Sequence, residues 1–275
     1  MGLSSNTLWH QTKKDGLKGI IKDKCLYLSY SLEDMTSLGY IAKFAYPMVS
    51  VCDLPLSETG NYLKKYGDYM IGFSAEWGAR NKFSTVWYCG NKTFSLHTVL
   101  GMLARKINEF GDNIDVDRDY QRIIYIMSYV KQYEGPLPKR NYKNYRFYDE
   151  RELRFVPDYD TLKELGEKPF LWDYEGYKKS HKNSSLLTKE LNITFEWEDI
   201  KYIIVETEDE KKEFWKLIEA SSRRSDLHIP ILTNKEVKED IIGTSHDVKN
   251  SIEHVEFTDA EIDEMIESIF GKQSG

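Results

Sequence analysis

The chain has 275 residues, of which 40% are hydrophobic, 13% aromatic and 30% charged, and its formal net charge at pH 7 is −7. This composition is that of a folded globular protein, and the length suffices for one large domain or for one domain with an appendage. The acidic balance disfavours tight, nonspecific nucleic-acid binding and leaves room only for a local basic patch.

The cysteines and the distribution of apolar residues indicate where the protein works. Cys25, Cys52 and Cys89 are odd in number, far apart and without a CxxC spacing, so we expect neither a disulfide framework nor a zinc site. No apolar run approaches the roughly 20 residues that a membrane-spanning helix needs, and the N-terminus does not resemble a leader. We therefore expect a cytoplasmic protein that does not enter a membrane.

The first 31 residues predict a strand, a helix and a second strand. Residues 7–11 read as the first strand, and Thr12-Lys13-Lys14-Asp15 resembles a capping box that opens a helix. That helix would place Leu17, Ile20 and Ile21 on one face. Residues 26–31 alternate with period two, as a strand does. Further strand candidates, β-branched or aromatic and bounded by Pro, Gly or Asn, are 48–52, 69–73 and 86–89.

Two helices are expected in the middle of the chain, separated by the turn-rich residues 111–117. Their apolar stripes recur at helical spacing and consist of Leu96, Val99, Leu100, Leu103, Ile107 and Phe110, and of Tyr120, Ile123, Ile124, Met127 and Val130. We assign both stripes to core packing, which is the usual place of such patterns. Residues 136–145 form a basic, aromatic loop that either is a solvated connection or binds phosphates or bases.

Residues 147–157 place two carboxylates two positions apart on an expected strand. Because side chains alternate along a strand, Glu150, Glu152 and Arg154 should share one face, while Leu153 and Phe155 point to the other. A strand that is held by a buried apolar face and presents paired carboxylates suits an active site. The alternative is an exposed strand with cross-strand ion pairs.

The last third of the chain predicts another strand at 201–206 and a capping box, Thr207-Glu208-Asp209-Glu210, that opens a helix. A second capping box at 258–261 precedes an apolar stripe formed by Ile262, Met265, Ile266, Ile269 and Phe270. This amphipathic helix would dock on its own domain, or it would contact a partner or a second copy in a homodimer. We expect an α+β domain with a mixed, curved or split sheet over residues 1–220, then a flexible segment and this helix over 221–275.

Several short stretches together resemble AbiGi-type abortive-infection proteins of bacteria, over most of residues 3–206. They are residues 8–12, 16–21, 25–31, 47–57, 66–73, 76–78 and 147–157. The resemblance implies a role in phage defence. Proteins of this group are described as the antitoxin-like member of a two-gene system, which implies a cognate toxin or a phage protein as partner.

A looser resemblance concerns chemistry. A His on the first strand, a Leu-x-x-Ile-Ile helix, a strand with Tyr and Ser, and a late Glu before apolar strand residues are similar to the ADP-ribosyltransferase superfamily, in particular to its DarT type. The resemblance implies that His10 binds a ribose hydroxyl of NAD, that Tyr27 or Tyr30 stacks on nicotinamide, and that Glu152 is catalytic with Glu150 assisting. Residues 136–145 become a candidate contact for NAD or for a nucleic-acid or protein target. The glycine-rich and Ser-Thr-Ser motifs of several subgroups are absent.

Two functions therefore stay open: an NAD-dependent ADP-ribosyltransferase, and a noncatalytic antitoxin or phage-sensing binding protein with the same fold. Cleavage of the bond between nicotinamide and ribose develops positive charge on the sugar, which a carboxylate stabilises. Other chemistries have less support. The remaining histidines lack metal-ligand spacing, and no GxSxG, P-loop or dinucleotide fingerprint is present, so no metal is expected. Cys52, beside Ser50 and Asp53, reads as a small core residue rather than as a nucleophile.

Overall fold

The computed structural model describes residues 5–34, 43–66, 68–90, 93–110, 117–137, 142–171, 174–180, 187 and 190–239. Over this part the protein is α+β with a mixed sheet, as the sequence predicted. No helix among these residues is long and apolar enough to cross a membrane. The expected C-terminal helix and the homodimer contact through it lie outside the described residues and stay predictions.

In the described part of the chain, the main sheet has eight strands, and β4 is its longest. The order is β14-β13-β5-β1-β4-β11-β6, and β3 also pairs with β4. Only β13 and β14 are parallel; the other neighbours are antiparallel. The strands are β1 (Thr7–Thr12), β3 (Ser29–Asp34), β4 (Lys43–Asp53), β5 (Tyr69–Ser74), β6 (Ser84–Thr85), β11 (Glu152–Phe155), β13 (Ile200–Val205) and β14 (Ile231–Thr233).

The sheet splits along β4. The first part of β4, from Lys43 to Met48, pairs with β3. Near its end, Cys52 and Asp53 pair with β1, while residues 49–52 pair with β11. Because β1 and β3 occupy different stretches of the same strand, they part from each other beside β4. This is the split sheet that the sequence predicted, and it creates the opening in which the candidate site lies.

Three short strand pairs surround the main sheet. They are β2 (Cys25–Tyr27) with β12 (Asn192–Thr194), the parallel pair β7 (Trp87–Cys89) with β8 (Val130–Gln132), and β9 (Glu134–Leu137) with β10 (Tyr142–Arg146). The segment 136–145, which we expected to be a loop, thus lies partly in the β9–β10 pair. The expected strand 26–31 is two strands, because the pairing changes from β12 to β4 after Tyr27.

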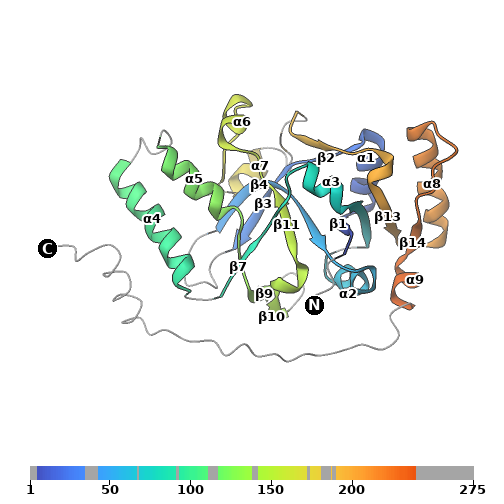
Figure 1. Cartoon of the computed structure of the whole chain (residues 1–275), viewed down its shortest axis with the longest axis horizontal. Coiled ribbons are helices and arrows are strands. Elements are labelled where there is room, and N and C mark those ends of the chain that lie inside the picture. The colour runs from blue at the N-terminus through green and yellow to red at the C-terminus, as the bar shows by residue number, and fades with distance from the viewer. Residues whose placement is uncertain are drawn as a thin grey trace.

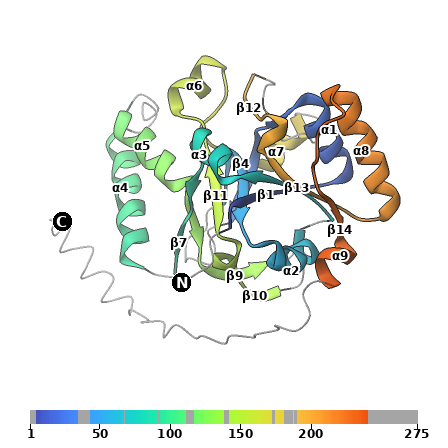
Figure 2. The same ribbon diagram turned by 45° about the vertical axis from the view of Figure 1, so that its right-hand side comes forward.

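Helices stand at both ends of the sheet (Figure 1), with α4 and α5 at one end and α8 and α9 at the other. Figure 2 shows α1 beside α8 and α2 beside α9. The α-helices are α1 (Lys14–Asp23), α2 (Leu56–Tyr66), α3 (Ala75–Arg80), α4 (Phe94–Phe110), α5 (Arg118–Met127), α6 (Tyr159–Glu164), α7 (Tyr174–Ser180), α8 (Glu208–Ser222) and α9 (Asn234–Glu239), and the 3-10 helices are η4 (Phe147–Glu150) and η5 (Trp197–Asp199).

The apolar stripes of the helices are buried where the sequence predicted core. Leu17, Ile20 and Ile21 of α1 join a cluster with Phe73 of β5 and Phe214 of α8. The α5 stripe and, from the α4 stripe, Leu96, Val99, Leu100 and Leu103 form a second cluster with β4, which confirms that these side chains serve packing. These contacts fix α1 and the central strands, and so they hold the walls of the opening in the sheet.

The two expected helix starts differ. At α8 the Thr207 side chain accepts the Glu210 N–H, and the Glu210 carboxylate accepts the Thr207 N–H, so the capping box is confirmed. At α1 the capping residue is Lys13, which makes no side-chain cap, so the predicted box is wrong. Within the segment after residue 220 that we expected to be flexible, β14 adds a strand to the main sheet. The division of the chain into two domains stays a prediction.

Candidate functional site

A cavity of about 990 Å³ lies where β1 and β3 part from each other beside β4, with α1 on one side and the η4–β11 segment on the other. Its volume is at the upper end of the range of roughly 300–1,000 Å³ for ligand pockets, so a dinucleotide-sized ligand is within its capacity. Cys52 of β4 pairs with Trp9 of β1 on one side and with Glu152 of β11 on the other, so these three side chains share one face of the sheet. The side chain of His10, the next residue on β1, points to the other face. Because the sheet splits here, one cavity reaches both His10 and Glu152.

The glycines of α1 shape the wall opposite the charged residues. A Cβ on Gly16 would meet Thr12 Oγ1 at 2.2 Å, so a larger residue at that position would require the Thr12 side chain to move. A Cβ on Gly19 would have no neighbour within 4 Å, and Gly19 lines the cavity. The space in front of Gly19 is therefore open to a ligand.

His10 lies on β1 with its Nδ1 3.0 Å from the backbone oxygen of Ser50 on β4. A carbonyl oxygen can only accept, so Nδ1 carries the proton and Nε2 is left with its lone pair. Burial lowers the pKa of His10, and the Ser50 carbonyl opposes this only in part. The ring is therefore neutral at physiological pH and offers an acceptor on Nε2.

The charged face of β11 is buried, which reverses the prediction. Glu152 and Arg154 do share a face, but their exposed fractions are 5% and 0%, whereas Leu153 and Phe155 are only half-buried. The strand runs inside the sheet, and both of its edges are hydrogen-bonded, one to β4 and the other to β6. The carboxylate and the guanidinium tolerate this burial because they pair with each other and with further charges.

Glu150 is not on the strand, contrary to our prediction. It ends the 3-10 helix η4, and Arg151 follows in the left-handed region with φ 44°, which breaks the alternation. The Glu150 side chain is nevertheless buried, with 2% exposed, and lines the same cavity as Glu152. Lys131 of β8 joins them: its Nζ lies 2.8 Å from Glu150 Oε2 and 2.6 Å from Glu152 Oε2.

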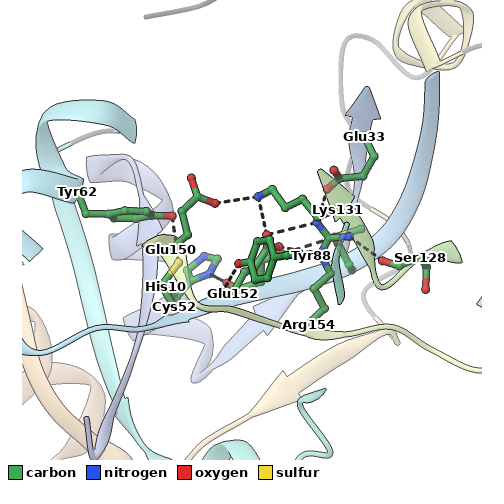
Figure 3. Close-up of polar contacts among 12 residues, drawn as sticks. His10, Glu33, Cys52, Tyr62, Tyr88, Ser128, Lys131, Glu150, Glu152 and Arg154 are labelled. Carbon is green, nitrogen blue, oxygen red and sulfur yellow. Dashed lines mark hydrogen bonds and ion pairs between the residues drawn. The ribbon is translucent and has the colours of Figure 1, made fainter. Parts of the chain in front are cut away.

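Arg154 holds the other side of Glu152 (Figure 3). Its Nε donates to Glu152 Oε1 at 2.7 Å, its Nη1 to the Ser128 backbone oxygen at 2.6 Å, and its Nη2 to Glu33 Oε1 at 2.5 Å. Burial alone would disfavour the charged Glu152 carboxylate, but Arg154 and Lys131 together hold its pKa well below the ordinary value. For Glu33 the desolvation prevails over the attraction of Arg154 and raises the pKa.

Of the two tyrosines proposed for nicotinamide, the structure brings one to the cavity. Tyr27 of β2 lines it. Tyr30 of β3 is in the core with 1% exposed, and its hydroxyl donates to the Lys168 backbone oxygen at 2.8 Å. Its neighbours Ser29 and Ser31 line the cavity instead, as strand alternation requires. His10, Tyr27, Glu150 and Glu152 are thus brought together, and Tyr30 is not.

Sequence reasoning missed Lys131, Glu33 and Tyr88, whose hydroxyl accepts the Glu152 backbone N–H at 2.8 Å. No local motif marks them, because each reaches the site through pairing between distant strands. Cys52 is buried, and its Sγ donates to the Tyr62 hydroxyl at 3.1 Å; burial raises the pKa of its thiol, which suits a core residue rather than a nucleophile. Within the described ranges, no group of three or more His, Cys, Asp or Glu could hold a metal ion.

A family model described as "Putative abortive phage resistance protein AbiGi, antitoxin" matches residues 18–206. The chain belongs to this family. The abortive phage resistance protein AbiGi of Lactococcus lactis subsp. cremoris is 23% identical to it over an alignment of 182 residues, and the match covers 58% of this chain and 72% of the relative. The abortive-infection resemblance predicted from the sequence is therefore confirmed.

Two solved structures of DarT from Thermus sp. 2.9 are also similar. The complex with NAD+ has a TM-score of 0.35 at 12% identity and covers 86% of this chain and 99% of that chain. The complex with carba-NAD+ has a TM-score of 0.34 at 12% identity, covering 84% and 97%. The likeness is loose, and it carries no argument about the site of the AbiGi-family chain.

Proposed function

We propose that this AbiGi-family protein acts in phage defence by binding NAD in the cavity and transferring ADP-ribose from it to a nucleic-acid or protein target. One observation carries the proposal. His10, Tyr27, Glu150 and Glu152 were selected from the sequence for an NAD site, and they come from four different elements to line a single cavity of about 990 Å³. Their convergence depends on pairing between strands that are distant in the sequence, and this pairing was not used when the four residues were selected.

The residues present fit the parts of NAD. The neutral His10 ring offers Nε2 as an acceptor for a ribose hydroxyl, since Nδ1 is occupied by the Ser50 carbonyl. Tyr27 offers a ring to the flat nicotinamide. The open space in front of Gly19 receives a further part of the ligand.

Glu152 has the charge that the reaction needs. NAD supplies a ribose–nicotinamide bond whose cleavage leaves the electron pair on nicotinamide and positive charge on the sugar. An ionised carboxylate about 4 Å from that charge contributes roughly 4 kcal/mol at an effective dielectric of about 20, which is roughly a thousandfold in rate. Arg154 and Lys131 keep Glu152 ionised, and their three contacts leave about one of its roughly four acceptor positions for a ligand.

The first test is to fill the cavity. Gly19→Trp puts a large side chain into the space in front of Gly19, and a helix tolerates this exchange because glycine is a poorer helix former than tryptophan. We expect NAD binding, followed by calorimetry, to weaken at least about tenfold. Lys22→Trp is the matched control, since it adds the same side chain to the exposed side of the same helix. Equal NAD affinity of the two variants would contradict binding in this cavity.

The second test removes the charge. Glu152→Gln should lower nicotinamide release and ADP-ribose transfer from labelled NAD at least about a hundredfold. Because Glu152 is buried and paired with Arg154, the variant should also lose stability, so turnover is compared at a temperature at which circular dichroism shows both proteins folded. If the wild type neither binds NAD nor releases nicotinamide, the transferase proposal is wrong.

A second candidate is a noncatalytic antitoxin or phage-sensing protein that uses the same fold to hold a cognate toxin or a phage component. Two observations favour it. The family description contains the word antitoxin, and both carboxylate oxygens of Glu152 already have cationic partners. In this case Gly19→Trp and Glu152→Gln should leave phage protection in a plating assay intact as long as they fold. Loss of protection in parallel with loss of NAD turnover would support the transferase instead.

A further inference from the structure

Five charged side chains form one buried network beside the cavity. Glu33 comes from β3, Lys131 from β8, Glu150 from η4, and Glu152 and Arg154 from β11. With three acidic and two basic members, the network has a formal excess of one negative charge. The charges thus link β3, β8 and η4 to β11, in addition to the backbone ladders that join β3 and β11 to β4.

Lys131 is the only Lys or Arg among the described residues that line the cavity. Its side chain is 13% exposed, and its ammonium lies 5.1 Å from the centre of the Phe147 ring, while Nζ contacts Glu150 and Glu152. Since one Nζ contacts both carboxylates at hydrogen-bond distance, the two acidic groups lie within about two hydrogen-bond lengths of each other. Without a cation between them, two ionised carboxylates this close repel each other.

We propose that Lys131 is a positioning residue that holds the side chains of Glu150 and Glu152 side by side on the cavity wall, while Arg154 fixes Glu152 from behind. The catalytic consequence of this arrangement rests on the proposed transferase function, whereas the arrangement itself does not. Strand alternation, from which we predicted that Glu150 and Glu152 share a face, does not bring the two carboxylates together; the Lys131 cation does.

The charges that face Lys131 are consistent with a permanently cationic side chain. Burial disfavours its charged form, but Glu152, Glu150 and Glu33 outweigh the burial and the repulsion from Arg154, so its pKa is raised well above the ordinary value. Lys131 therefore stays charged at neutral pH.

Lys131→Met tests the proposal, with Lys131→Arg as the conservative variant and Lys178→Met as the matched control. Like Lys131, Lys178 pairs with glutamate and lies near an aromatic ring: its Nζ is 3.2 Å from Glu175 Oε1 and 4.9 Å from the centre of the Tyr174 ring. Unlike Lys131, it has a single glutamate partner in that pairing, is more exposed and does not line the cavity. Carbon-13 NMR of labelled glutamate carboxylates, assigned with Glu152→Gln, follows Glu152 between about pH 4 and pH 8.

We expect the Glu152 carboxyl to remain ionised through this range in the wild type, in Lys131→Arg and in Lys178→Met. In Lys131→Met the Glu152 carboxyl should begin to take up a proton within this range, because one of its two cations is gone. A Glu152 carboxyl that stays fully ionised down to about pH 4 in Lys131→Met would overturn the proposal. If Lys131→Met does not fold, Lys131→Met/Glu150→Gln keeps the formal charge of the network. The proposal then requires a higher Glu152 titration than in Glu150→Gln alone, and equal titrations would overturn it.

Kinetics give an independent measurement. Misplacement of Glu152 should lower kcat for nicotinamide release by about a hundredfold in Lys131→Met while KM for NAD changes less than about threefold, and Lys131→Arg should recover most of kcat. A rise in KM with unchanged kcat would show that Lys131 binds ligand instead of positioning Glu152. If the wild type releases no nicotinamide, the proposed function fails, and the NMR titration alone decides the role of Lys131.

Discussion

Replacement of Arg154 by methionine removes the centre of the buried network. Arg154 is fully buried and donates four hydrogen bonds, two to Glu152, one to Glu33 and one to the Ser128 backbone oxygen. Methionine has a similar length and is apolar, so it fills much of the space without supplying a donor. Arg154→Met therefore leaves the Ser128 oxygen without this donor, and it removes the cation that Glu33 shares with Glu152.

The expected loss of stability is large for a single substitution. Removing one partner of a buried ion pair costs about 3–5 kcal/mol, because the remaining charge stays buried without compensation. Lys131 still contacts Glu152 Oε2, which keeps the expected loss near the lower end, about 3–4 kcal/mol. With a urea dependence of about 2–3 kcal/mol per molar, the unfolding midpoint should fall by roughly 1–2 M.

Urea unfolding at neutral pH measures this loss, and Arg146→Met is the matched control. Arg146 pairs with Asp149 at 2.6 Å, but both side chains are well exposed, with 35% and 45% accessible. An exposed pair contributes only about 0–1 kcal/mol, so the control should shift the midpoint little. If Arg154→Met shifts the midpoint no more than Arg146→Met does, the network does not hold β11 in place and our interpretation of its energetics is wrong.

Three further outcomes are expected. In native protein a thiol reagent should react with Cys89, which is half-buried, before Cys25 and Cys52, which are buried, and Cys89→Ser should abolish the early phase. Thr207→Ala removes the capping box of α8 and should lower the free energy of unfolding by about 1 kcal/mol, as measured in urea. Burial raises the pKa of Glu33, so the folded state holds its proton more tightly than the unfolded state, and Glu33 destabilises the fold as the pH rises. When the pH is raised from about 5 to about 8, the free energy of unfolding should therefore fall less in Glu33→Gln than in the wild type. An equal fall in both proteins would contradict a raised pKa of Glu33.

Local patterns in the sequence were sufficient for the elements and for their buried faces. The helical spacing of Leu17, Ile20 and Ile21 depends on which side chains leave water, and the structure buries these side chains. The capping box at Thr207 was equally local and is present. The strand predicted at residues 7–11 is also present and carries His10, whereas the place of His10 in an NAD site came from the resemblance and stays a prediction.

The contacts that build the site depend on distant pairing, which no local pattern contains. Alternation along β3 shows that Tyr30 points to the opposite face from Ser29 and Ser31. Which of the two faces is buried depends on the segment around Lys168, which covers Tyr30. The position of Glu150 depends on the left-handed backbone of Arg151, which is a non-glycine residue and gives no signal in the sequence. Lys131 lies on a three-residue strand whose partner is more than 40 residues away, so its approach to Glu152 could not be anticipated.

The contribution of the buried network to stability does not by itself explain its presence. A buried ion pair is often no more stabilising than well-packed apolar residues of the same volume, so stability alone does not account for five charged side chains beside β11. The apolar clusters on both sides of the main sheet show that this fold packs such residues elsewhere. Three members of the network, Lys131, Glu150 and Glu152, line the cavity. The pKa values of Lys131 and Glu152 are strongly shifted, and charged groups with such shifts in a cavity are typical of functional sites. The position of the network at the split in the sheet therefore favours a role in binding a ligand, whether that ligand is the NAD of a transferase or a cationic group of a protein partner.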